Sequence, residues 1–154
     1  MNSSTERLAA AADLVAAQEE IVDTFALLDD WTDRYQYIID LGKQLPPFPE
    51  EYKTEEYRLK GCQSQVWIRT DLVDGVLQIR ATSDSAIVAG LIALLLRVYS
   101  GRRPADIIAT PPDFIRRIDL EAHLSPTRSN GLSAMVQQIR QMAVEALSRA
   151  RRGA

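Results

Sequence analysis

The stretch VWIRTDLVDGVLQIRAT, residues 66–82, decides the fold class of this chain. Two runs of strand-forming residues flank Asp74 and Gly75, and an Asp-Gly pair between such runs is a strong β-hairpin signal, because both turn residues need positive φ angles. A two-residue turn joins two strands in antiparallel order. One face of the second strand is the more apolar, through Leu77, Ile79 and Ala81. We therefore predict an antiparallel hairpin with one face on a hydrophobic core.

Upstream of the hairpin, apolar residues at helical spacing predict two helices. The first covers residues 5–28, and the second covers residues 31–41, with Asp30 as its N-cap and Gly42 as its stop. The proline-rich segment that follows cannot continue a helix. Residues 57–60 are then predicted to add a short third strand to the sheet.

Downstream of the hairpin, a continuous apolar run predicts a helix over residues 86–100 that is buried on most sides. The apolar run is too short to span a bilayer, which takes about 20 residues. Gly101 is the expected stop of this helix, and three candidate N-caps precede it: Ser83, Asp84 and Ser85. After a helical turn and a Pro-Pro loop, we predict a turn-rich loop over residues 124–131 and a final amphipathic helix that begins at Leu132.

The order of these elements predicts an α+β fold. The strands lie together in the middle of the chain and do not alternate with helices, which argues against a parallel doubly wound sheet. We expect a small antiparallel sheet of about three strands covered by helices. The length of 154 residues suits one domain.

Composition and charge exclude several functional classes. A net charge of −3 argues against a nucleic-acid-binding protein, which usually carries a basic domain. The sequence has no phosphate-binding loop, no dinucleotide-binding glycine motif and no metal-ligand spacing. One cysteine cannot form an internal disulfide, and the first residues lack the basic-then-apolar pattern of a signal peptide. We therefore expect a cytoplasmic protein that binds neither nucleic acid nor membrane.

The single cysteine, Cys62, is the strongest candidate for chemistry. It stands in RLKGCQSQVW, residues 58–67, after Gly61 and before three polar residues, which is not the sequence of a core position. A glycine allows a sharp turn and close approach by a partner. Arg58 and Lys60 lie just upstream, and nearby cations favour the reactive thiolate form. The alternative is an inert, buried small residue.

A reactive thiol at Cys62 is compatible with three further roles. A hydrolase or transferase would use Cys62 as nucleophile and His123 as base, although nothing in the sequence places His123 near Cys62. A redox sensor usually needs a resolving cysteine, which this chain lacks. A scaffold for an iron–sulfur cluster needs several thiolates, and this chain has one.

Four segments, in this order, resemble the SufE family, which includes CsdE. They are RYQYIIDLGKQLP (34–46), GCQSQVWI (61–68), SDSAIVAGLIALLL (83–96) and HLSPTRSNGLSAM (123–135). The resemblance covers roughly residues 20–147. It leaves residues 1–19 as a partly helical N-terminal extension and residues 148–154 as a basic C-terminal tail.

The resemblance implies a function in iron–sulfur cluster assembly. Members of the family are sulfur acceptors with an α+β fold similar to the IscU-type scaffold. They take persulfide sulfur from a cysteine desulfurase of the SufS or CsdA type, stimulate it, and pass the sulfur to a SufBCD-type scaffold. The pyridoxal phosphate belongs to the desulfurase, so the resemblance implies no cofactor in this chain and no enzymatic activity of its own. A monomer or a weak homodimer is expected.

The resemblance also implies roles for single residues. Cys62 matches the persulfide acceptor, and we expect its loop to have a tucked resting state and an extended docked state. Three residues are expected to support the thiol: Gly61, Gln63 and Arg128. Two are expected to face the desulfurase: Ser83 and Asp84.

Overall fold

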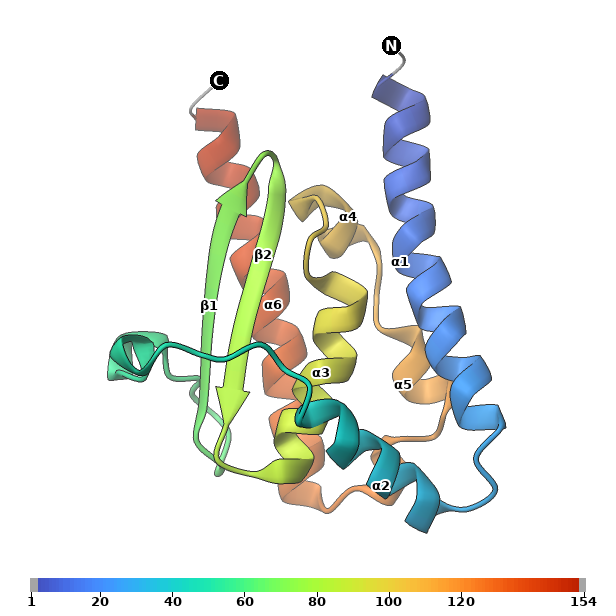
Figure 1. Cartoon of the computed structure of the whole chain (residues 1–154). Helices are drawn as coiled ribbons and strands as arrows, with labels where there is room; N and C mark the ends of the chain where they lie inside the picture. The colour runs from blue at the N-terminus through green and yellow to red at the C-terminus, as the bar shows by residue number, and fades with distance from the viewer. Residues whose placement is uncertain (1–2, 153–154) are drawn as a thin grey trace.

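The hairpin predicted from residues 66–82 forms the whole sheet of the computed structural model, which describes residues 3–152 (Figure 1). Val73 pairs with Val76 across the turn, where Asp74 and Gly75 have φ angles of 53° and 82°. These positive angles are those that a tight hairpin turn requires. At the other end of the ladder Val66 pairs with Ser83, which fixes the register of the two strands.

The predicted α+β class is confirmed, with helices on both sides of the hairpin in the chain. The elements are α1 (Ser3–Ala26), α2 (Trp31–Gly42), β1 (Val66–Val73), β2 (Val76–Ser83), α3 (Ala86–Tyr99), α4 (Pro104–Ala109), α5 (Asp113–Arg117) and α6 (Pro126–Arg152). Short 3₁₀ turns lie at Glu50–Tyr52, Glu55–Tyr57 and Glu121–His123. Within residues 3–152, no helix is long and apolar enough to cross a membrane.

The prediction of a third strand over residues 57–60 is wrong. The described residues form two strands, and this segment contributes a single β-bridge between Arg58 and Trp67. A 3₁₀ turn occupies the chain up to Tyr57, and Gly61 turns it again with a φ angle of 87°. Too few extended residues remain between the two turns to build a ladder.

The helix α3 forms the centre of the core. Figure 1 shows it between the hairpin and α1, while α6 runs behind the hairpin. As predicted, it is buried on most sides, and it ends before Gly101, whose φ angle is 77°. Its buried residues are Val88, Gly90, Leu91, Ile92, Leu94, Leu95, Val98 and Tyr99. A helix that is apolar around most of its circumference needs neighbours on all of those sides.

Two glycines let α2 pack directly against α3. A Cβ on Gly90 would lie 2.1 Å from the carbonyl oxygen of Ile38, and a Cβ on Gly42 would lie 2.6 Å from the backbone nitrogen of Gly90. The N-cap of α2 is Asp30, as predicted, because its Oδ1 accepts a hydrogen bond from the backbone nitrogen of Asp33 at 2.9 Å. Gly42 is the last residue of α2, but the following residue stays in the right-handed helical region. Gly42 is therefore a close-contact residue and not a left-handed helix stop.

The last helix begins earlier than predicted, at Pro126 instead of Leu132. The side chain of Ser125 accepts a hydrogen bond from the backbone nitrogen of Arg128 at 3.3 Å, and its carbonyl accepts one from Ser129 at 2.8 Å. Proline suits the first helical position, where its missing N–H is not needed. The segment 124–131, predicted as a loop, therefore supplies the first turns of α6.

The helix α1 crosses the predicted domain boundary at residue 19 without a break. The part of α1 before this boundary also packs into the core, where Leu14 is fully buried. The buried side chain of Gln18 links α1 to the segment around α5. It donates to the carbonyl of Pro111 at 3.1 Å and accepts from the backbone nitrogen of Phe114 at 2.9 Å. These bonds satisfy a polar group that would be costly to bury alone.

We expect Gly90→Ala to destabilise the protein, because the added methyl would overlap backbone atoms of α2 that cannot rotate away. Overpacking of this kind typically costs about 1–3 kcal/mol, and urea unfolding followed by circular dichroism measures it. Thr32→Ala, at an exposed position of α2, is the control and should change the free energy of unfolding by no more than about 0.5 kcal/mol. An unfolding midpoint for Gly90→Ala equal to that of the control would contradict the packing described here.

Candidate functional site

The loop that carries Cys62 is closed at its base. The backbone nitrogen of Leu59 donates to the carbonyl of Val66 at 2.8 Å, and Arg58 bridges to Trp67 one residue further out. Residues 60–65 therefore form a short loop whose two ends are held together. The positive φ angle of Gly61 lets the chain turn immediately before the cysteine.

A second tie joins this loop to the start of α3. The side-chain Oδ1 of Asp84 accepts a hydrogen bond from the backbone nitrogen of Gln65 at 3.1 Å, and its backbone nitrogen donates to the Gln65 carbonyl at 3.3 Å. Of the three candidate N-caps, the cap is Ser85, whose hydroxyl accepts from Val88 at 3.4 Å. The hydroxyl of Ser83 accepts from the backbone nitrogen of Ser85 at 3.1 Å. Asp84 thus holds the cysteine loop instead of capping the helix.

The Cys62 thiol lies half-buried against the core. It lines a cavity of about 10 Å³, which is room for about one water-sized sphere. The other lining residues come from the loop itself, from α3 and from α6: Ser64, Val88, Leu91, Thr127, Arg128, Gly131 and Met135. The floor is apolar and well covered, since Val88, Leu91 and Met135 are 3%, 1% and 2% exposed.

The structure brings Arg128 and Cys62 to the same cavity. Arg128 reaches it from the first turn of α6, which lies within the segment predicted as a loop. Arg128 is exposed to solvent as well as lining the cavity. Gln63 is exposed at the loop surface and is not among the residues lining the cavity.

Gly131 is a residue of the site that the sequence prediction missed. A Cβ built on it would lie 2.9 Å from the Sγ atom of Cys62, closer than such atoms approach. A glycine inside a helix costs about 1 kcal/mol relative to alanine, so its presence there signals a packing reason. The sequence hides this signal, because Gly131 falls in the segment 124–131 that is predicted as a turn-rich loop.

His123 is placed elsewhere. Its ring stacks on Trp31 with centroids 3.9 Å apart and planes 12° apart, and its Nδ1 lies 3.0 Å from the carbonyl oxygen of Asp119. It is not among the residues that line the Cys62 cavity. The geometry therefore gives no support to a Cys–His dyad. Among residues 13–152, whose side chains the structure describes, no three His, Cys, Asp or Glu side chains gather closely enough to hold a metal ion.

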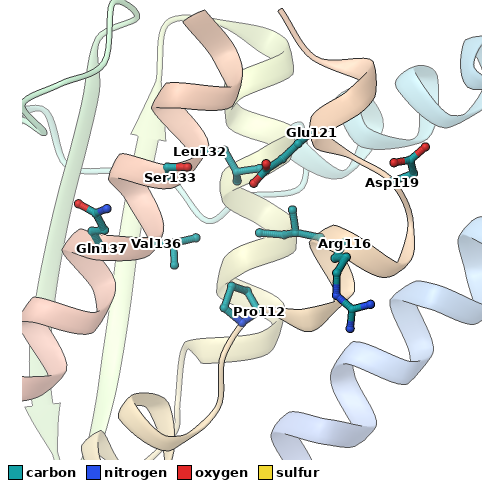
Figure 2. A pocket seen from close by; sticks show the side chains of 9 residues that line it. Pro112, Arg116, Asp119, Glu121, Leu132, Ser133, Val136 and Gln137 are labelled. Atoms are coloured by element: carbon teal, nitrogen blue, oxygen red, sulfur yellow. The ribbon is translucent and has the colours of Figure 1, made fainter. Parts of the chain in front are cut away.

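A wider cavity of about 470 Å³ lies between α5 and α6 and contains none of the predicted site residues. Figure 2 shows Ser133, Val136 and Gln137 on α6, with Pro112 and Arg116 on the facing wall. Its lining combines apolar side chains with the charged residues Arg116, Asp119 and Glu121 and contains no cysteine. The wider cavity therefore does not coincide with the candidate site at Cys62.

A comparison with protein families decides the classification. The family model described as "SufE: Fe-S metabolism associated domain" matches residues 19–143. The chain belongs to the SufE family. Its four sequence segments resembling that family thus identify it correctly, and membership points to a role in iron–sulfur metabolism and sulfur transfer.

Relatives from two bacteria agree with this family assignment. An uncharacterized SufE-like protein of Rhizobium meliloti (strain 1021) is 43% identical over 127 residues, which cover 79% of this chain and 91% of that protein. An uncharacterized SufE-like protein of Rhizobium etli is 42% identical over 134 residues, covering 84% of this chain and 90% of the relative.

The fold also has a solved counterpart. The solution structure of a hypothetical protein from Thermus thermophilus superimposes with a TM-score of 0.71 at 23% sequence identity. The match covers 86% of this chain and 96% of that one. At this identity the likeness establishes the shared fold and carries no further statement about chemistry.

We expect Asp84→Ala to loosen the Cys62 loop, because it removes the acceptor for the backbone nitrogen of Gln65. Alkylation of Cys62 by iodoacetamide should be faster, and the free energy of unfolding should fall by about 0.5–1.5 kcal/mol, the usual contribution of one hydrogen bond. Asp84→Asn is the matched control, since its amide oxygen can accept the same bond. Equal alkylation rates in both variants and the parent protein would show that this bond does not restrain the loop.

Proposed function

We propose that this SufE-family protein accepts persulfide sulfur on Cys62 from a pyridoxal-phosphate-dependent cysteine desulfurase and carries it to an iron–sulfur cluster scaffold. The observation that carries the proposal is the position of the only cysteine. It lies at the tip of a short loop, against a cavity about one atom in size, in a chain whose family is associated with iron–sulfur metabolism. SufS- and CsdA-type desulfurases are the expected donors, and a SufBCD-type assembly is the expected acceptor.

The transfer step is a displacement at sulfur, related to thiol–disulfide exchange. The thiolate of Cys62 attacks the outer sulfur of the donor persulfide and forms a new S–S bond. The S–S bond of the donor breaks, and the donor cysteine leaves as a thiolate. The hydrogen stays on the transferred sulfur, so Cys62 becomes a persulfide with no net oxidation or reduction.

The loop geometry supports two states for this chemistry. In the resting state the thiol lies against the apolar floor formed by Val88, Leu91 and Met135. The outer sulfur of a persulfide held there would be shielded from reductants. In the docked state the loop tip extends into the cleft of the desulfurase, while the bonds at Leu59–Val66 and Asp84–Gln65 keep its ends in place. Arg128 then offers a positive charge to the attacking Cys62 thiolate and to the donor thiolate that leaves.

The carrier proposal is better supported than the hydrolase or transferase. A catalytic dyad needs its base within hydrogen-bond reach of the nucleophile, and His123 is engaged with Trp31 and Asp119 instead. A carrier is itself loaded and unloaded and needs no such base. A free thiol of this kind is suited to a reducing compartment, and we expect the protein to act in the cytoplasm.

The direct test is intact mass under non-reducing conditions after incubation with an active desulfurase and free cysteine. We expect the protein to gain the mass of one or more sulfur atoms, reversibly on addition of a reductant. Cys62→Ser should gain nothing, and His123→Gln should gain as much as the parent. No gain with the cognate desulfurase would overturn the carrier proposal, and loss of the gain in His123→Gln would favour the dyad.

Hydrogen exchange tests the two loop states. Addition of a desulfurase should speed amide exchange in residues 60–65, because the docked loop leaves its resting contacts. The hairpin turn at Asp74 and Gly75 is the internal reference and should exchange at the same rate with and without the partner. A change at the turn, or none in the loop, would count against an extended docked state.

A further inference from the structure

We propose that Gly131 of α6 sets the resting depth of the Cys62 thiol and is a positioning residue for sulfur transfer. The role in sulfur transfer rests on the proposed function, whereas the contact between Gly131 and Cys62 does not depend on it. Gly131 is buried, and the space where its Cβ would be is filled by the Sγ atom of Cys62 at 2.9 Å. The thiol thus occupies a notch in the surface of the helix.

The notch differs from the other close glycine contacts of the fold. A Cβ on Gly90 or Gly42 would meet backbone atoms of the neighbouring helix, which cannot move without shifting that helix. A Cβ on Gly131 would meet only Cys62 among the described residues beyond the backbone of α6 and its chain neighbours, with Sγ nearest and the Cys62 Cβ at 3.9 Å. Sγ is the free end of a rotatable side chain on a loop. A methyl group at position 131 should therefore displace the thiol and leave the helix in place.

The sequence supports this reading of the glycine. Glycine weakens the interior of a helix relative to alanine, and α6 continues for many residues on the far side of Gly131. Its own N-cap and first-turn proline already define the start of the helix, so the glycine is not needed to begin or end it. Room for the cysteine is the packing reason that remains.

The depth of the thiol sets a balance between the rate at which Cys62 is loaded with sulfur and the rate at which the persulfide is reduced. With Gly131 the thiol reaches the apolar floor, and the outer sulfur of a persulfide there is out of reach of small thiols. With a larger residue the thiol sits further out, so it should load faster and also lose its sulfur faster. That loss consumes two reductant thiols, which become a disulfide, and yields the Cys62 thiol and hydrogen sulfide, so atoms and electrons balance.

The test compares Gly131→Ala with Ser133→Ala, an exposed position on the same helix where alanine also favours helix. The probe is 5,5′-dithiobis(2-nitrobenzoate), which reports the reactivity of Cys62 without any desulfurase. We expect Gly131→Ala to raise the second-order rate constant about tenfold or more, which corresponds to about 1.4 kcal/mol in the exposure equilibrium, and Ser133→Ala to leave it unchanged. Equal rates in the two variants would overturn the inference.

A second measurement uses a variant that lacks the thiol. In a Cys62→Ala background the notch is empty, so Gly131→Ala should raise the melting temperature by about 2–4 °C, as expected when a helix glycine becomes alanine. With Cys62 present, the same substitution should give a smaller rise or a fall. If Gly131→Ala alone does not fold, the double variant should fold again. Equal effects in both backgrounds, or a double variant that fails to fold, would also overturn the inference.

The proposed function can fail separately from this inference. In one outcome, Gly131→Ala raises the reactivity of Cys62 while neither this variant nor the parent protein gains sulfur from a desulfurase. That result would support the positioning role of Gly131 and overturn the proposed carrier function. If the parent gains sulfur, we expect the Gly131→Ala persulfide to decay at least several-fold faster in dithiothreitol, as followed by intact mass. A persulfide of unchanged lifetime would contradict the protective role of the notch.

Discussion

The burial of α3 is the constraint on which the rest of the structure depends. This helix is apolar on nearly every side, so the hairpin, α1, α2 and α6 must all cover it. Its closest neighbour, α2, can approach only because Gly42 and Gly90 lack side chains at the contact. The first turns of α3 then supply Val88 and Leu91, which form the floor beneath the Cys62 thiol. The packing that stabilises the fold therefore also builds the site.

The register of the hairpin also positions the cysteine loop. Because Val66 pairs with Ser83, the last loop residue, Gln65, comes beside Asp84 at the entrance of α3. A shift of one residue would turn the inward side chains outward and separate these partners. The Asp74–Gly75 turn fixes this register from the far end of the ladder. The position of the cysteine thus follows from a turn many residues away.

The sequence predicts the elements that depend on local signals and misses those that depend on distant contacts. The hairpin, the Asp30 cap and the buried α3 each have a strong local pattern, and Cys62 is conspicuous as the only thiol. The predicted third strand is wrong because turns on either side leave no room for it. The predicted start of α6 is wrong because the turn-forming residues of segment 124–131 indicate a loop in the sequence, whereas the folded chain is helical from Pro126. The role of Gly131 is missed because the residue falls in this predicted loop. Its contact with the Cys62 thiol is visible only in the folded chain.

An acceptor of persulfide sulfur meets two opposing requirements. Its thiol must reach the donor, yet the loaded sulfur must be kept from competing thiols. A rigid exposed cysteine satisfies only the first, and a cysteine in a rigid core satisfies only the second. A loop tied at both ends by backbone bonds, with its tip resting in a notch on a helix, satisfies both, because only a few residues need to move. Under the proposed function, mobility limited to that tip would let the thiol change its exposure and leave the hydrophobic core undisturbed.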